Sequence, residues 1–188
     1  MTASTATQTT ASTPTGSPDC ASLPNARTYE GKCVSNGATL TFVNKGTVAH
    51  LKSLDVKVNG VSTAQSYSSG NGVASATARG TFVTVNLTVA NRLDSPQQFD
   101  ESDTGQVELQ VGKSTYTPNF DAVNQADQQS FLSGNNNTIQ PGESQSGDVV
   151  FDVPSGQFQT ALNHGAVVVV DFGASPNSAT SGAVLKIF

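Results

Sequence analysis

The chain has 188 residues, enough for one domain with a buried core, and its nine Lys and Arg against fourteen Asp and Glu give a formal net charge of −5. The basic residues are scattered singly, which argues against nucleic-acid binding because a phosphate backbone is held by several cations acting together. No apolar run approaches the roughly 18 to 20 residues of a membrane-spanning helix, so we expect no membrane span.

The first 18 residues are mostly Thr, Ser, Ala, Pro and Gly and carry no charged side chain. Such a segment cannot bury enough apolar surface to offset the entropy lost on ordering. We therefore expect a disordered linker over residues 1–18 and a folded domain over residues 19–188. The linker is interpreted either as a stalk that holds the domain off a cell surface, behind a lipid-modified cysteine further upstream, or as a tail without a role.

Cys20 and Cys33 are the only two cysteines of the chain. We expect them to form a disulfide, which implies an oxidising compartment and hence an extracellular or envelope-attached protein. A metal or redox site is the alternative. It is disfavoured because the spacing is not CxxC and no histidine lies near either thiol.

Short strands separated by turn residues begin near residue 38. In ATLTFV, residues 38–43, Leu40 and Phe42 share one face. The stretch 54–58 alternates inward Leu and Val with outward Asp55 and Lys57. Ser62 to Gly80 is rich in Ser, Gly and Ala, and we expect an exposed, mobile connection with ragged strand ends there.

The next segments indicate a core strand, a hairpin and a short helix. Residues 82–90, FVTVNLTVA, alternate strictly, and residues 106–111 form a strand that Gly112 and Lys113 turn back into STYTP. Between residues 119 and 138, Asp121 is expected to cap a short helix covering one end of the sandwich. Its apolar positions would be Ala122, Ala126, Phe131 and Leu132.

Residues 139–154, IQPGESQSGDVVFDVP, combine a turn with a core strand. Pro141 and Gly142 suit the two central positions of a type II turn. Residues 166–172 are a continuous apolar strand and residues 183–188 supply a last strand, so about eight strands predict an all-β, antiparallel β-sandwich. The two central strands should share one core, formed by Val83, Val85, Leu87, Val149, Phe151 and Val153.

Three stretches, FVTVNLTVAN, VELQVGKSTYTP and IQPGESQSGDVVFDVP, carry a family resemblance in their order and spacing. Over residues 38–172 the chain resembles the bacterial extracellular immunoglobulin-like superfamily that includes a mycobacterial secreted immunoprotective antigen and many lipoprotein domains of unknown function. The resemblance implies an immunoglobulin-like β-sandwich, export and a low-complexity N-terminal linker. It brings no catalytic residues, and the region of Cys20 and Cys33 and the 62–80 connection depart from the family pattern.

Candidate catalytic and phosphate-binding patterns are weak. Only His50 and His164 can serve as a base, and no GxSxG nucleophile motif is present. GKST at residues 112–115 resembles the end of a phosphate-binding loop, but Val107 stands where that loop needs its first glycine. We therefore expect neither an enzyme nor a cofactor.

Asp100, Glu101 and Asp103 form an acidic loop, with Asp94 shortly before it. Calcium prefers several oxygen ligands from a flexible loop, so this loop is a candidate calcium site. The spacing is not that of an EF-hand, and a solvated acidic turn is the commoner case. We accordingly assign no metal site.

The favoured hypothesis is a non-catalytic secreted or cell-surface module that binds a protein or glycan partner, since sandwiches present functional loops at both ends. The alternatives are a structural component of an envelope assembly, in which free edge strands pair with neighbours, and a secreted hydrolase. The identity of the ligand and the oligomeric state do not follow from the residues.

Overall fold

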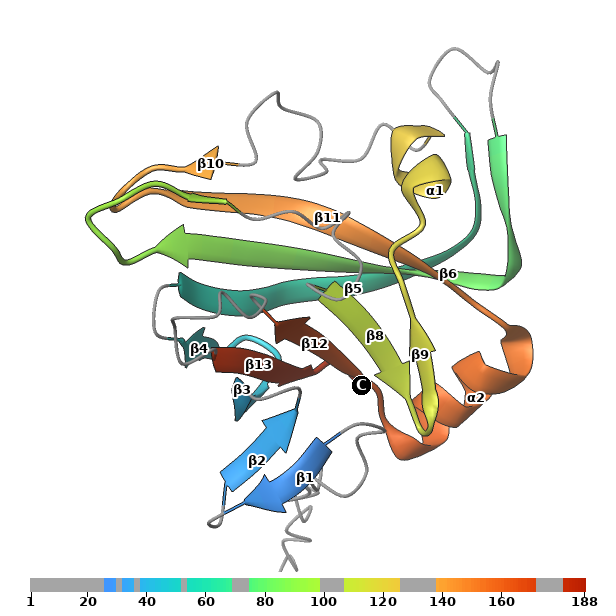
Figure 1. The fold of residues 1–188 in the computed structure, drawn as a ribbon. Coiled ribbons are helices and arrows are strands. Elements are labelled where there is room, and N and C mark those ends of the chain that lie inside the picture. The colour runs from blue at the N-terminus through green and yellow to red at the C-terminus, as the bar shows by residue number, and fades with distance from the viewer. Residues whose placement is uncertain are drawn as a thin grey trace, which may run out of the picture.

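The computed structural model describes residues 26–29, 32–35, 38–51, 54–68, 75–98, 107–125, 138–171 and 181–188. Two β-sheets pack face to face, which confirms the expected β-sandwich (Figure 1). The larger sheet has seven strands in the order β1-β2-β3-β13-β12-β8-β9. These are β1 (Ala26–Tyr29), β2 (Lys32–Ser35), β3 (Ala38–Asn44), β13 (Ser181–Lys186), β12 (Val167–Asp171), β8 (Val107–Val111) and β9 (Ser114–Tyr116).

The smaller sheet has four strands in the order β11-β6-β5-β4. These are β11 (Ser144–Val153), β6 (Ser75–Asn91), β5 (Leu54–Ser68) and β4 (Val48–His50), and a separate ladder joins β10 (Thr138–Ile139) to β7 (Gln97–Gln98). The described chain holds more strand segments than the eight or so expected, because several of them are only two to four residues long.

The last strand, β13, lies inside the larger sheet between β3 and β12. It runs antiparallel to β12 but parallel to β3, with Val184 opposite Phe42. The sandwich is therefore antiparallel with this one exception among the described strands. A parallel neighbour needs a long connection. Here almost the whole domain separates β3 from β13 in sequence.

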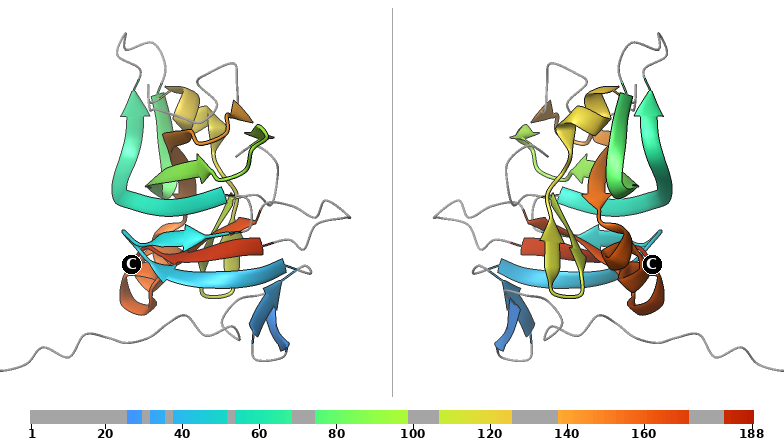
Figure 2. Two further views of the ribbon diagram at one scale, coloured as in Figure 1. Left: turned by 90° about the vertical axis from the view of Figure 1, so that its left-hand side faces the viewer. Right: turned by 90° about the vertical axis from the view of Figure 1, so that its right-hand side faces the viewer.

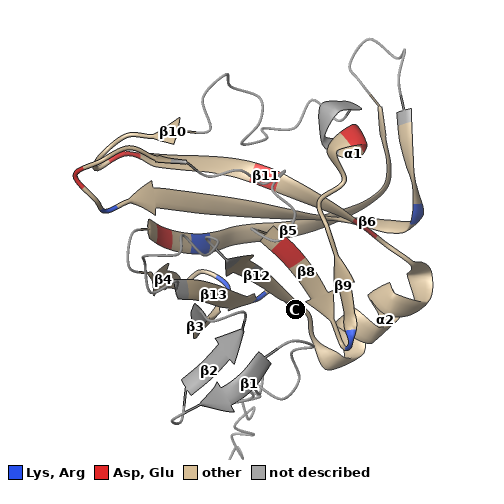
Figure 3. Cartoon of the chain, in the orientation of Figure 1, with Lys and Arg blue, Asp and Glu red and all other residues tan. Residues whose placement is uncertain are grey.

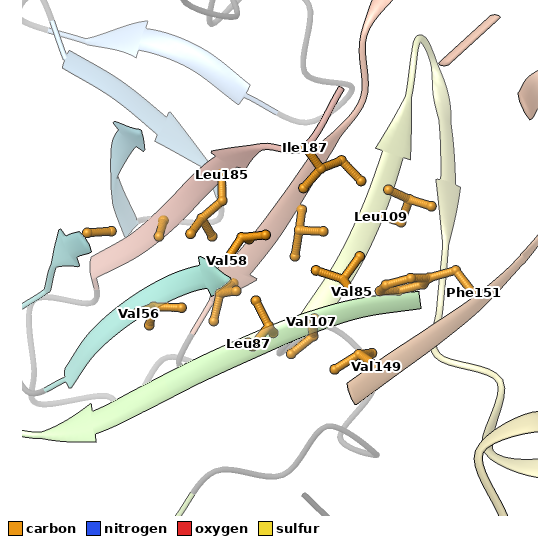
Figure 4. Packing of buried hydrophobic residues seen from close by; sticks show 14 of the residues in the cluster. Val56, Val58, Val85, Leu87, Val107, Leu109, Val149, Phe151, Leu185 and Ile187 are labelled. Carbon is orange, nitrogen blue, oxygen red and sulfur yellow. The ribbon is translucent and has the colours of Figure 1, made fainter. Parts of the chain in front are cut away.

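The core between the sheets has the register that the alternating patterns predict. Val85 lies opposite Val149, and Val83 lies opposite Phe151. The six residues expected to share a core are each at most 1% exposed: Val83, Val85, Leu87, Val149, Phe151 and Val153. Leu109 and Leu185 meet them from the other sheet (Figure 4). Burial of this apolar surface is the main stabilising contribution to the fold.

Residues 62–68 and 75–80 are strand, so regular pairing extends further into this segment than expected, while the expected connection at residues 69–74 lies outside the described residues. β5 and β6 stay paired out to Ser68 and Ser75, with irregularities near Gly60 and Gln65 that bend the hairpin. Tyr67 stacks on Phe82 with ring centroids 5.2 Å apart, and its hydroxyl hydrogen-bonds to the hydroxyl of Thr84. These contacts supply the stability that the Ser, Gly and Ala composition lacks.

The expected type II turn is present at Pro141 and Gly142. The amide of Glu143 donates to the carbonyl of Gln140 at 3.0 Å, and Gly142 has φ of 74°. The amide of Gly142 also donates to the carbonyl of Asn91, which ends β6. The turn is thus fixed to the end of β6, where Asn91 is buried with 2% of its surface exposed.

Helix α1 (Phe120–Gln125) confirms the predicted short helix, but its cap differs from the prediction. The amide of Ala122 donates to Oδ1 of Asn119 at 3.0 Å, so Asn119 is the capping residue and Asp121 lies in the first turn. Ala122 packs with Phe82 and Val150 on the outer face of the smaller sheet. The other expected apolar positions, Ala126, Phe131 and Leu132, lie outside the described residues.

Helix α2 (Ser155–His164) was not predicted from the sequence. It begins directly after Pro154, which follows the last residue of β11 and cannot extend its ladder of hydrogen bonds. Ala161 is buried in the main core, and Phe158 packs edge-on against Phe188 with centroids 6.1 Å apart. The signal in the sequence is the apolar spacing of Phe158, Ala161 and Leu162, which is helical.

Candidate functional site

A polar cleft of about 480 Å³ opens where β9, the last strand of the larger sheet, faces the end of β11 in the smaller one. Its wall is the continuous run 115–121, which leaves β9 and enters α1, and the opposite side is formed by Arg79 and Asp152. The right-hand view of Figure 2 shows the β8–β9 hairpin on this side of the molecule, with α1 above it. The free margins of the two sheets thus create the cleft.

An ion pair between Arg79 and Asp152 fixes the chemistry of one wall. The Nε of Arg79 donates to Oδ2 of Asp152 at 3.0 Å, and the backbone amide of Arg79 donates to Oδ1 at the same distance. The Asp152 side chain is 8% exposed, whereas that of Arg79 is 80% exposed. Both carboxylate oxygens are therefore satisfied by one residue. No described residue binds the terminal nitrogens of the guanidinium, which remain available to a ligand.

Gly80 allows β6 to approach the end of β11 closely beside this pair. A Cβ placed on Gly80 would lie 2.3 Å from the backbone nitrogen of Ser155 and 2.4 Å from the carbonyl oxygen of Val153. Only glycine fits such a backbone contact without displacement. The residue therefore sets the position of Arg79 relative to the strand that carries Asp152.

The remaining side chains of the cleft combine an acid with two aromatic rings. Asp121 is exposed and has no ion pair with another described residue. Tyr116 and Phe120 are half-buried and line the same space. With Asp152 neutralised by Arg79, the cleft keeps one uncompensated negative charge. It can accept hydrogen bonds or a cation and offers an aromatic surface, a composition suited to binding rather than to nucleophilic chemistry.

A second polar feature is a row of hydrogen-bonded side chains across the outer face of the smaller sheet. Asn59 Nδ2 donates to Oδ1 of Asn86 at 2.8 Å, and Asn86 Nδ2 donates to Oδ1 of Asp148 at 2.6 Å. The hydroxyls of Thr88 and Ser146 are 2.6 Å apart in the next position. Mutual hydrogen bonds hold these side chains in place, which makes the row a cross-strand stabilising feature.

The two histidines lie on different elements, His50 in β4 and His164 in α2. Nδ1 of His50 is 2.9 Å from Oδ1 of Asp55, and Nη1 of Arg92 donates to the same oxygen at 3.2 Å. No hydroxyl hydrogen-bonds to His50 or to His164 among the described residues. His164 is exposed in the last turn of α2. Among the described residues, His50 therefore has the carboxylate of Asp55 as a partner but no hydroxyl that could act as the nucleophile of an acyl transfer.

Several predicted site residues lie outside what the structure describes. Asp100, Glu101 and Asp103 are among them, so the weak calcium candidate stays untested. Cys20 also lies outside, and only the backbone of Cys33, in β2, is described, so the disulfide stays a prediction. No group of three or more potential metal-ligating side chains occurs within the described residues.

The sequence did not reveal the cleft. Arg79 fell in the supposed connection, and its partner Asp152 is 73 residues away. Charged residues are spread singly over the described ribbon, without a basic stretch that would have drawn attention to one strand (Figure 3). None of the described helices is both long and apolar enough to cross a membrane.

Comparison with known proteins supports the fold and leaves the activity open. A conserved hypothetical protein from Bacillus anthracis has a TM-score of 0.55 at 17% identity, covering 76% of this chain and 92% of that one. The yjhA protein from Bacillus subtilis has a TM-score of 0.56 at 14% identity, covering 77% and 99%. The secreted protein MPT63 from Mycobacterium tuberculosis has a TM-score of 0.48 at 16% identity, covering 78% and 96%.

No curated protein is similar enough to the chain to count as a match. The family model for a domain of unknown function, DUF4352, matches residues 43–169. This range contains all three stretches that carry the sequence resemblance, and it lies within the residues 38–172 over which that resemblance extends. Since the match spans more than half of the chain, the protein belongs to the DUF4352 family of β-sandwich domains of unknown function.

Proposed function

We propose that this protein is a non-catalytic, exported module that binds a partner in the cleft between β9 and β11, at the cell surface or in the cell envelope. The observation that carries the proposal is the pair of Arg79 and Asp152. A buried carboxylate fixes an arginine whose terminal nitrogens face solvent at the mouth of a polar cleft. Preorganised polar groups of this kind lower the entropic cost of binding.

The export half of the proposal is supported by the two cysteines and by the uncharged linker over residues 1–18. The non-catalytic half is supported by the surroundings of His50, whose ring faces Asp55 and Arg92 and no hydroxyl. The described residues that line the cleft include neither histidine nor serine. Binding is therefore the activity that its side chains support best.

The test is binding of fluorescently labelled protein to intact cells of the source organism, with Arg79→Ala and Arg92→Ala compared. Arg92 is the matched control, because it is also an exposed arginine paired with an aspartate, and it lies just beyond the C-terminal end of β6, away from the cleft. We expect saturable binding that Arg79→Ala weakens at least tenfold and Arg92→Ala leaves unchanged. Absence of saturable binding, or equal binding by both variants, would refute the proposal.

A further inference from the structure

The edge of β9 that faces away from β8 pairs with no other described strand. β9 is the last strand of its sheet, and its register pairs Val111 with Ser114 on either side of the two-residue turn. In such a hairpin the closing pair exchanges both hydrogen bonds, and the next pair along points its backbone groups outward. The amide and carbonyl of Thr115 therefore point away from β8, toward the cleft that Thr115 lines.

The same alternation continues beyond the strand. Thr117 lies just beyond the end of β9 and also lines the cleft, and extending the strand alternation to it directs its backbone groups the same way as those of Thr115. Pro118 has no amide hydrogen to donate. The amide of Asn119 donates to the carbonyl of Val150 on β11 at 2.7 Å, which closes the opening at this end. The backbone donors and acceptors of Thr115 and Thr117 are thus left without a strand partner among the described residues.

The charge of the cleft indicates what else an occupant carries. Arg79 compensates Asp152, whereas Asp121 is exposed and has no ion pair among the described residues. A ligand that brings a cation to Asp121 gains an interaction that a neutral ligand does not. Thr115 and Thr117 are themselves exposed, so no described side chain covers the open edge.

We propose that the occupant of the cleft is an extended polypeptide segment of a partner protein, which adds to β9 as the next strand of the larger sheet. Its backbone pairs with Thr115 and Thr117, and a Lys or Arg side chain of the segment lies beside Asp121. This mode of recognition draws affinity from main-chain hydrogen bonds and selectivity from alternate side chains. The inference rests on the proposed function, because it names the partner of the same cleft.

The first test selects ligands from a phage-displayed library of random short peptides against the full chain. We expect enrichment of peptides that carry a basic residue among β-branched ones. Addition of a selected synthetic peptide should protect the amides of Thr115 and Thr117 from hydrogen exchange. N-methylation of the alternate peptide residues that face β9 should abolish binding, whereas N-methylation of the intervening residues should leave it within about twofold.

Protein variants provide an independent test. Thr115→Pro removes the open donor without removing a hydrogen bond to β8, and proline is tolerated on an edge strand. It should weaken peptide binding at least tenfold, whereas Thr115→Val should bind as the wild type does. Asp121→Asn should weaken binding of a lysine-containing peptide about two- to fivefold, as expected for an exposed ion pair. The N-methylated peptides decide the matter if Thr115→Pro unfolds.

The outcomes separate this inference from the proposed function. Glycan-array binding that is lost in Arg79→Ala, without any selected peptide, would support the cleft as a binding site and overturn the peptide segment. A dimer in which Thr115 and Thr117 become protected would identify a second copy of the chain and also overturn the inference. Absence of any ligand sensitive to Arg79→Ala would overturn both proposals.

Discussion

Replacing Gly80 by alanine should destabilise the domain, because the added methyl group meets backbone rather than flexible side chains. The three closest atoms to the new Cβ are Ser155 N at 2.3 Å, Val153 O at 2.4 Å and Pro154 C at 2.6 Å. Ordinary contact needs about 3.5 to 4.0 Å. The junction of β11 and α2 would therefore have to move by about 1 Å. Overpacking typically costs about 1 to 3 kcal/mol, and rigid neighbours place this change at the upper end.

Replacing Gly by Ala also lowers the conformational entropy of the unfolded chain, which stabilises the folded protein by up to about 1 kcal/mol. This stabilisation offsets only part of the cost of overpacking. We expect a net loss of about 2 kcal/mol, which lowers the melting temperature by roughly 4 to 8 °C for a domain of this size. Urea unfolding and calorimetry measure both. Gly156→Ala is the matched control, since it lies in α2 with nothing within 4 Å of the new Cβ and should be neutral or stabilising. A Gly80→Ala protein with the wild-type urea midpoint would show that the close approach is not real.

Three other changes test separate features. Gly142→Ala should cost about 1 to 2 kcal/mol, because an alanine must adopt the positive φ that the type II turn requires, and Gly142→Asn should cost less in the same urea titration. Asn86→Ala should lower the free energy of unfolding by about 1 to 2 kcal/mol, because the hydrogen bonds to Asn59 and Asp148 are lost. Thr63 is exposed on the neighbouring strand, and Thr63→Ala should leave the stability unchanged. Cys20 and Cys33 should resist alkylation when the unreduced protein is unfolded, so the mass of the protein should not rise. A mass increase of two alkyl groups would show that the disulfide is absent and would refute the main sequence argument for an extracellular location.

The sequence predicted those parts of the fold that depend on local pattern. Val83, Val85 and Leu87 alternate with polar residues, and alternation alone decides which face of a strand is buried. The turn at Pro141 and Gly142 follows from the φ values that these two residue types prefer. Both predictions needed no knowledge of what lies across the sheet.

The parts that were missed depend on partners distant in sequence. The β5–β6 hairpin is held in its outer half by the stack of Tyr67 on Phe82, which the surrounding Ser, Gly and Ala residues do not reveal. The cleft depends on Arg79 meeting Asp152, and no local pattern links two residues on separate strands. Asn119 rather than Asp121 caps α1. Both residue types can accept the capping hydrogen bond, so the sequence alone does not decide between the two positions.

The place of β13 within the larger sheet has a consequence for how the protein is made. Among the described strands, the one inserted between β3 and β12 is synthesised after all the others, so the two halves of that sheet share no ladder of hydrogen bonds until β13 is in place. Ala183, Leu185 and Ile187 are each at most 2% exposed, which means that the final residues complete the core rather than extend it. Pairings between segments so far apart are slow to form. We therefore expect the joining of the two halves of the larger sheet to be a late step in folding.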